Sequence, residues 1–217
     1  MSTFPVTQAF YMGASRPRWQ PSRVLEAAAA AVLLALVSPV LAVAAAVVWA
    51  LCGRAPFVAH RRVGLQGAPL WVFKLRTMWD APARAPFHLI EYLRADRIGI
   101  PKTKSDPRIT SRFAAFCRRY SIDELPQLWQ VVSGDLSFVG PRPITSREME
   151  RYYANAREVL SVKPGLTGLW QINGRGCLGY RQRRRLDLLL VRRFSPALYI
   201  AILLRTPLKV LSGQGAW

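Results

Sequence analysis

The sequence feature that most constrains the fold is a long apolar segment, Val24 to Cys52, in which Glu26 is the only charged residue. As one unbroken helix at about 1.5 Å per residue, it would be long enough to span a hydrocarbon core about 30 Å thick. Ser38-Pro39 lies in its middle. Because proline removes a backbone donor and clashes with the preceding turn, we expect the helix to kink or break there. A break would leave halves of about 18–21 Å, each too short to cross a bilayer alone.

Cations on both sides of this segment leave two membrane arrangements open. Three arginines precede it and three follow it: Arg16, Arg18 and Arg23, then Arg54, Arg61 and Arg62. A spanning helix normally carries its Lys/Arg excess on one side, whereas equal flanks favour both ends on the cytoplasmic face. A kinked span and a re-entrant hairpin over residues 23–53 are both consistent with the residues. We expect residues 1–22 to form a flexible polar segment and residues 54–217 to form the globular domain.

The charge of the chain restricts its partners. A formal charge of +19 over 217 residues indicates an acidic partner, which could be nucleic acid, anionic lipid or a phosphorylated substrate. The three cysteines and two histidines are too dispersed for a disulfide framework or a metal cluster, which favours a reducing cytoplasm.

Shorter patterns predict the elements of the domain. We expect two strands from Phe57 to Met78 around a turn at 64–67, then a short helix around Phe87 to Leu93 within a mobile segment 80–105. A turn at Asp106-Pro107-Arg108 should lead into a helix from about Ser111 to Arg119. A second helix should run from the capping box Thr145/Glu148 through Val159, and a strand should follow at Leu169–Ile172. Alternation in the second strand puts Lys74 and Arg76 on one face and Trp71, Phe73 and Leu75 on the other.

The C-terminal third contains a basic amphipathic helix, Tyr180 to Phe194, followed by an apolar run from Pro196 to Leu204. Such a pair is typical of a segment that lies on an anionic membrane surface. A charged, solvated face beside a core helix is the alternative. The apolar segment at 24–52 favours the membrane interpretation.

Chemistry is concentrated between Ser121 and Pro143, where Asp123 and Glu124 stand among the cations Arg118, Arg119 and Arg142. One carboxylate of such a pair can attack phosphorus or bind metal while arginines balance the charge of a phosphate ligand. Ser121 and Glu124 also fit a capping box at a helix start, with Gly134 closing the helix. The two interpretations are compatible. Glycine-rich stretches at 163–168 and 173–176 beside Arg175 fit either a phosphate-binding backbone or ordinary turns.

Taken in order, these motifs resemble the bacterial sugar transferases, in the short monotopic form of the polyprenyl-phosphate phosphoglycosyl transferases. The resemblance covers about Arg23 to Leu211. Its carriers are Ser38-Pro39, HRRVG at 60–64, KLRTM at 74–78, DPRIT at 106–110, the whole of 121–143, and KPGLTGLWQINGR at 163–175.

The resemblance implies an α+β fold, mostly helical with a small antiparallel sheet, held by a re-entrant helix hairpin broken at Ser38-Pro39 on the cytoplasmic face of the bacterial inner membrane. It implies a transferase of the EC 2.7.8 type that moves a sugar phosphate from a UDP-sugar to undecaprenyl phosphate, releases UMP and initiates exopolysaccharide or surface-glycan assembly. Asp123 would form a covalent phosphosugar intermediate, and Glu124 would bind Mg²⁺. Phosphate or nucleotide contacts are expected from Arg118, Arg142 and Arg175, and also from Lys74, Arg76 and Arg108.

Three positions depart from the family pattern: His60 in the block before Arg61, Leu190 where tyrosine is common, and Tyr199 where aspartate is common. They leave the carboxylate pair intact and bear on local contacts and the preferred sugar. The rival hypotheses are a non-enzymatic protein that binds nucleic acid or anionic membrane, and an idle scaffold of the family. If the protein is the enzyme, we expect no nucleic-acid partner, and a homodimer is compatible with the sequence.

Overall fold

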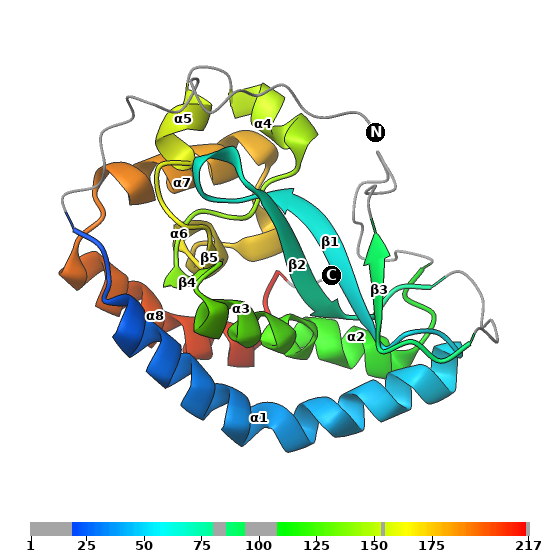
Figure 1. Ribbon diagram of the computed structural model, residues 1–217. Coiled ribbons are helices and arrows are strands. Elements are labelled where there is room, and N and C mark those ends of the chain that lie inside the picture. Colours follow the sequence, from blue (N-terminus) through cyan, green and yellow to red (C-terminus); the bar gives the residue numbers. More distant parts are fainter. Residues whose placement is uncertain (1–18, 80–85, 94–107, 153–154, 216–217) are drawn as a thin grey trace.

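A 30-residue helix, α1 (Arg23–Cys52), curves along one side of the molecule, and the rest of the domain packs against its inner face (Figure 1). The computed structural model describes residues 19–79, 86–93, 108–152 and 155–215. Helix α1 has the bounds expected for the apolar segment and ends at Gly53, whose φ of 64° closes it in the left-handed conformation. Most of the predicted flexible segment, residues 1–18, lies outside the described residues. Trp19 packs on Phe194 and Tyr199, with ring centroids 5.7 and 5.5 Å away.

Helix α1 continues through Ser38-Pro39, so the break expected there is a bend (Figure 1). Ser38 Oγ donates a hydrogen bond to Ala35 O (2.8 Å), a local bond of the kind that often accompanies helix bending. Proline cannot donate to the preceding turn, which accounts for the bend at this point. The hairpin in the membrane stays a prediction.

The predicted pair of strands belongs to a three-stranded sheet in which β1 is central and β2 lies at an edge. Strands β1 (Phe57–Val63) and β2 (Pro69–Leu75) pair antiparallel from Phe57↔Leu75 to Val63↔Pro69, around the 3₁₀ turn η2 (Leu65–Gly67). A third strand, β3 (Ile90–Leu93), pairs parallel to β1. The expected helix around 87–93 is therefore wrong, and the sheet is mixed rather than antiparallel. Residues 80–85 and 94–107 of this region, including Asp106-Pro107, lie outside the described residues.

Helices and short strands make up the rest of the domain. In chain order they are α2 (Arg112–Arg119), η3 (Ile122–Gln127), α3 (Leu128–Ser133), β4 (Ser137–Val139), α4 (Ser146–Tyr152), α5 (Ala156–Val159), β5 (Gly165–Thr167), α6 (Leu169–Ile172), η5 (Arg175–Cys177), α7 (Tyr180–Arg192) and α8 (Pro196–Ser212). The capping box of α4 is confirmed, with Glu148 N to Thr145 Oγ1 at 3.0 Å and Thr145 N to Glu148 Oε2 at 2.9 Å. Leu169–Ile172 is helical, so the strand predicted there is wrong. Its neighbour β5 pairs parallel to β4.

The core is attached to α1 at both of its ends. Glu26 and Ala30 are buried near its start, in a cluster with α3, β4 and α8. Its last two turns bury Ala44, Ala45, Val48 and Cys52 against α2 and the end of β2. Within α1, nothing between Ala30 and Ala44 is buried. The helix is thus buried most deeply near its two ends, while Leu34 and Val37 of its middle are partly buried against the first cluster and their neighbours are exposed.

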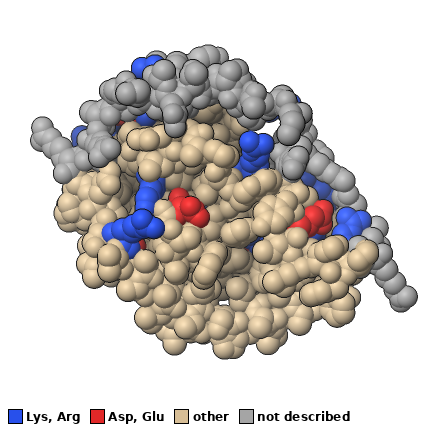
Figure 2. Space-filling view, in the orientation of Figure 1, with Lys and Arg blue, Asp and Glu red and all other residues tan. Residues whose placement is uncertain are grey.

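The outward surfaces of α1 and α8 are apolar. On α1 the exposed side chains include Val24, Val32, Leu36, Val40 and Val43. On α8, exposed apolar side chains recur at one-turn spacing and share one face: Ile200, Leu204, Leu208 and Leu211. Figure 2 shows the lower part of one face of the molecule, over α1, without a charged side chain in view. Such a continuous apolar surface is uncommon on a soluble monomer.

Candidate active site

The carboxylate pair lies on the 3₁₀ helix η3, between α2 and α3. Because a 3₁₀ helix has about three residues per turn, residues three apart share a face, which gives three faces here. Ile122 and Leu125 pack into the two apolar clusters that flank α1. Asp123 and Pro126 are buried on a second face, and Glu124 shares the third with Gln127. Adjacent carboxylates are thereby turned apart and held on a rigid turn.

Ser121 does not cap a helix, contrary to the capping-box interpretation. It adopts the left-handed conformation with φ 55°, and its side chain makes no cap hydrogen bond. Its hydroxyl accepts a hydrogen bond from Arg175 Nη2 instead. The expected end of the following helix is confirmed, because α3 stops at Ser133 and Gly134 has φ 83°. Ser121 therefore connects the carboxylate turn to the loop that carries Arg175.

A lysine from the sheet forms an ion pair with Glu124. Lys74 Nζ lies 2.6 Å from Glu124 Oε1, and the two side chains are 23% and 30% exposed. Burial alone would raise the pKa of Glu124, but the charge and hydrogen bond of Lys74, with the charges of Arg142 and Arg175, lower it to about 2. Glu124 is therefore ionised at every physiological pH. Lys74, Arg142 and Arg175 come from three separate parts of the chain, and their charges converge on one carboxylate.

Asp123 is the more buried carboxylate, with 7% of its surface exposed. Cys117 lies on α2, where the charge of Asp123 acts on its thiol. Burial, followed by the charge of Asp123, raises the pKa of the Cys117 thiol to about 11. The thiol is protonated at neutral pH, so of these two groups the carboxylate is the available nucleophile.

Several buried polar atoms around the pair have no hydrogen-bond partner among the described residues. They include Arg142 Nε, Arg175 Nη1, Gln127 Nε2 and Trp170 Nε1. All four are N–H donors, and buried donors are rarely left unpaired in native proteins. Arg142 also stacks over Trp170, with its guanidinium carbon 5.1 Å from the ring centroid. A set of unpaired donors that includes two arginine side chains is suited to an anionic ligand with several acceptor oxygens.

The other predicted cations have different surroundings. Arg76 is buried, binds Ala55 O at 2.7 Å and pairs with Glu91 of β3. It therefore joins the end of β2 to the neighbouring loop and strand, and it does not share the partner of Lys74 as their spacing suggested. Arg118 lies one turn before the pair and is 3.5 Å from Thr77 Oγ1. The backbone oxygen of Arg108 accepts a hydrogen bond from Trp79 N.

Gln130 is a site-forming residue that the sequence analysis missed. Its buried side-chain amide accepts from Phe73 N (3.0 Å) and donates to Trp71 O, so it pairs with the edge of β2 as a neighbouring strand would. Lys74 follows Phe73 directly, and Glu124 precedes Gln130 on adjoining helices. The contact thus fixes the strand carrying Lys74 against the carboxylate turn. The position of Gln130 as one of two glutamines in the otherwise apolar run 125–132 was the available signal.

The glycines at 163–168 serve packing. A Cβ on Gly165 would lie 2.0 Å from Gly140 N, and one on Gly168 would lie 2.5 Å from Gly140 O. Strands β4 and β5 can therefore approach only because side chains are missing there. The phosphate-binding interpretation of this glycine-rich stretch has no support from this packing. The second stretch, 173–176, differs because Gly174 and Arg175 both have positive φ.

The structure gives each departure from the family pattern a place. Tyr199 is buried and donates to Glu26 Oε1 (2.6 Å), which also accepts from Ser137 Oγ (2.5 Å) and Phe138 N (2.9 Å). Burial and the Glu26 carboxylate raise the pKa of Tyr199, so it stays a donor. Leu190 is fully buried in the core, and His60 lies opposite Val72 in the sheet. The departures thus concern packing and the attachment of α1.

The carboxylates of η3 are candidate ligands for the expected Mg²⁺. The described residues contain no group of three or more His, Cys, Asp or Glu that could enclose a metal ion. Magnesium in phosphate-processing sites commonly uses one or two carboxylates and completes its shell with water and substrate phosphate. An ionised Glu124 beside Asp123 fits that partial donor set.

Comparisons with known proteins agree with the resemblance. A family model described as bacterial sugar transferase matches residues 18–213. The chain is similar to a UDP-galactose-lipid carrier transferase of Erwinia amylovora (42% identical over 76% of this chain and 35% of the relative) and to an undecaprenyl-phosphate galactose phosphotransferase of Salmonella typhimurium (42% over 73% and 34%). It is also similar to the exopolysaccharide production protein ExoY of Rhizobium meliloti (36% over 94% and 92%). The chain thus spans about a third of the length of the first two relatives and nearly all of the third.

Proposed function

Since this chain belongs to the bacterial sugar transferase family, we propose that it transfers a sugar phosphate from a UDP-sugar to undecaprenyl phosphate and releases UMP. The names of two relatives mention a lipid carrier or undecaprenyl phosphate, and that of a third mentions exopolysaccharide production. We place the reaction at the first step of exopolysaccharide or other surface-glycan assembly.

The observation that carries the proposal is the charge arrangement around η3. Beside the buried Asp123, Glu124 pairs with a lysine, and the charges of Lys74, Arg142 and Arg175 lower its pKa to about 2. Unpaired buried donors of Arg142, Arg175 and Gln127 surround them. A nucleic-acid-binding surface would present exposed cations, and adjacent carboxylates among them would weaken its attraction for phosphates. A diphosphate needs this combination, because cations must offset its charge before a carboxylate can approach.

In the first step, an oxygen of Asp123 attacks the phosphorus that bears the sugar. A bond forms between this oxygen and phosphorus, and the bond from phosphorus to the bridging oxygen breaks. The bridging oxygen leaves with UMP, and the sugar phosphate stays on Asp123 as an acyl phosphate. Arg142 and Arg175 are suited to hold the donor phosphates, and Lys74 keeps Glu124 ionised and oriented.

In the second step, a phosphate oxygen of undecaprenyl phosphate attacks the same phosphorus. The bond from phosphorus to Asp123 breaks, which restores the carboxylate and yields the lipid-linked diphosphosugar. Glu124 would hold Mg²⁺, which when bound neutralises phosphate charge. Two displacements let one site serve a soluble donor and a lipid acceptor in turn.

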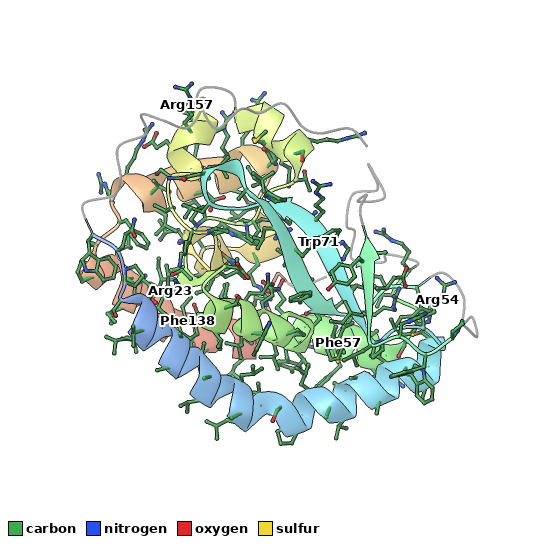
Figure 3. The ribbon with its side chains drawn as sticks, viewed as in Figure 1. Arg23, Arg54, Phe57, Trp71, Phe138 and Arg157 are labelled. Carbon is green, nitrogen blue, oxygen red and sulfur yellow. The ribbon has the colours of Figure 1, made fainter. Side chains whose placement is uncertain are left out.

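The shape of α1 supports a re-entrant arrangement in the membrane. At about 1.5 Å per residue its 30 residues would extend about 45 Å, yet both ends pack on the same domain. A helix that crossed the bilayer would have to carry one of these ends away from its packing partners. Arg23 and Arg54 lie at the two ends (Figure 3), and the exposed apolar middle lies between them. We therefore place both ends of α1 on the cytoplasmic face, with α8 lying at the membrane surface.

The deciding experiment measures UMP release by the full chain in nanodiscs, with Mg²⁺, undecaprenyl phosphate and a panel of UDP-sugars. Wild type should release UMP with one or a few donors, and Asp123→Asn should abolish release. Asp135→Asn is the matched control, because Asp135 is an exposed carboxylate bound to Ser133 Oγ. Without acceptor, a labelled donor should leave its sugar phosphate on the peptide containing Asp123. Undiminished release by Asp123→Asn would refute the covalent mechanism, and no release with any donor would favour the idle scaffold.

A further inference from the structure

The segment that follows α8 turns back onto the loop that carries Arg175. Gly213 ends α8 in the left-handed conformation with φ 61°, which redirects the chain. Two residues later, Gly215 O accepts a hydrogen bond from Gly176 N at 2.9 Å.

The contact with the Arg175 loop is close enough to exclude a side chain. A Cβ on Gly215 would lie 2.6 Å from Gly174 O, 3.3 Å from Arg175 Cβ and 3.4 Å from Gly176 N. Gly215 also has φ 71°, a conformation that other residues adopt at a cost. Two constraints therefore favour glycine at this position: its positive φ and its close contact with the Arg175 loop.

Arg175 needs such support because its own backbone is unfavourable. Its φ is 46°, which is uncommon for a residue with a side chain, and the preceding Gly174 has φ 150°. Strained backbone of this kind persists only where the surrounding structure holds it. Within the loop, Cys177 N bonds to Gly174 O and Leu178 N to Arg175 O. The bond from Gly176 to Gly215 adds an anchor from outside the loop.

The strained conformation has a consequence at the carboxylate pair. It is the backbone from which Arg175 reaches Ser121 Oγ and contributes its charge to Glu124. If Arg175 relaxed to negative φ, its side chain would leave the backbone along a different direction. The unpaired, buried Nη1 of Arg175 would then no longer face the position where an anion is expected.

We propose that Gly213–Gly215 is a positioning segment, which holds Arg175 in its left-handed conformation and aims the guanidinium at the donor phosphate. The part that concerns phosphate rests on the proposed function. The segment also connects the site to α8, whose exposed leucines 204, 208 and 211 are expected at the membrane surface. The position of α8 at the membrane and the position of Arg175 are therefore linked through the three residues Gly213–Gly215.

The test is a double-mutant cycle on kcat/KM for the UDP-sugar, using Gly215→Ala, Arg175→Ala and both together in nanodiscs. Gly215→Ala should lower kcat/KM roughly tenfold, because the backbone strain of an alanine at this positive φ, pressed against the Arg175 loop, shifts conformer populations by about that factor. In the Arg175→Ala background the same change should cost less than about twofold, since its target is gone. Gln214→Ala is the control for a side-chain effect, because the Gln214 side chain is exposed and accepts from Lys209 Nζ, while its backbone N, which the substitution keeps, donates to Ser212 Oγ. Equal losses in both backgrounds would overturn the proposal.

Hydrogen exchange at Gly176 supplies a readout that does not depend on turnover. Gly215→Ala should speed exchange of the Gly176 amide at least about tenfold while the amides of α3 keep their rates. Unchanged exchange at Gly176 would also overturn the proposal. If wild type releases no UMP with any donor, the proposed function fails by itself. Exchange at Gly176, with UMP binding as the substitute for kcat/KM, then still decides whether Gly215 positions Arg175.

Discussion

Replacing Lys74 by methionine should remove most of the stabilisation of ionised Glu124. Lys74 Nζ lies 2.6 Å from Glu124 Oε1 and supplies the largest of the effects that lower the pKa of this carboxyl. Methionine keeps the length and the apolar stem of the side chain and deletes the charge. Burial would then oppose the two more distant arginines, and the pKa of Glu124 should rise to its usual value of 4.5 or above.

The magnitude follows from the pKa. A fall from 4.5 to about 2 corresponds to about 3 kcal/mol at about 1.4 kcal/mol per pH unit. Arg142 and Arg175 supply part of it, and solvent screens a side chain that is 30% exposed. We therefore expect a coupling of about 1–2 kcal/mol between Lys74 and Glu124. Because the folded pKa lies below the unfolded one, this stabilisation is present above pH 4.5 and is lost as pH falls toward 2.

Urea unfolding of the detergent-solubilised protein, followed by tryptophan fluorescence, measures this coupling. Wild type, Lys74→Met, Glu124→Gln and the double variant form the cycle at pH 7. Lys163→Met is the control, because its charge is not among those that lower the pKa of Glu124. The difference between wild type and Lys74→Met should shrink as pH falls from 4.5 toward 2. A coupling below about 0.3 kcal/mol, or a difference independent of pH, would refute the electrostatic account of this pair.

Two further predictions concern α1. Tyr199→Phe removes one of three donors to the buried Glu26 carboxylate and should lower the free energy of unfolding by about 1–2 kcal/mol, more than Tyr180→Phe, whose hydroxyl donates to a neutral carbonyl oxygen. Equal costs in urea titrations would contradict this. The second prediction uses Ser22→Cys and Arg54→Cys, each in a Cys177→Ser background. Cys177 is exposed and must be removed, whereas Cys52 and Cys117 are buried and can stay. If both ends of α1 lie on one membrane face, the two variants should react with an impermeant thiol reagent from the same side of sealed vesicles. Reaction from opposite sides would establish a spanning helix.

Features that depend on nearby residues could be predicted from the sequence. The hairpin β1–β2, the helix α2, the capping box at Thr145 and the helix end at Gly134 follow from alternation, capping chemistry and glycine. The family followed from many motifs in one order, which is also a property of the chain alone. Four-residue elements were beyond this kind of inference. The mostly apolar pattern of Leu169–Ile172 fits a short helix and a short strand equally well. Ile90–Leu93 is a strand because it pairs with β1.

The site itself depends on contacts between distant parts of the chain. The sequence identified Asp123, Glu124 and a surplus of cations, but spacing treated Lys74 and Arg76 alike. Only the tertiary structure separates them, because the edge of β2 is bound by Gln130 with Lys74 toward Glu124, while Arg76 meets Glu91. Likewise, neither Glu26 beneath Tyr199 nor Gly215 against Arg175 follows from any local rule. Local chemistry determined which groups this protein has; long-range packing, which places residues far apart in sequence within hydrogen-bonding distance, decided which of them act together.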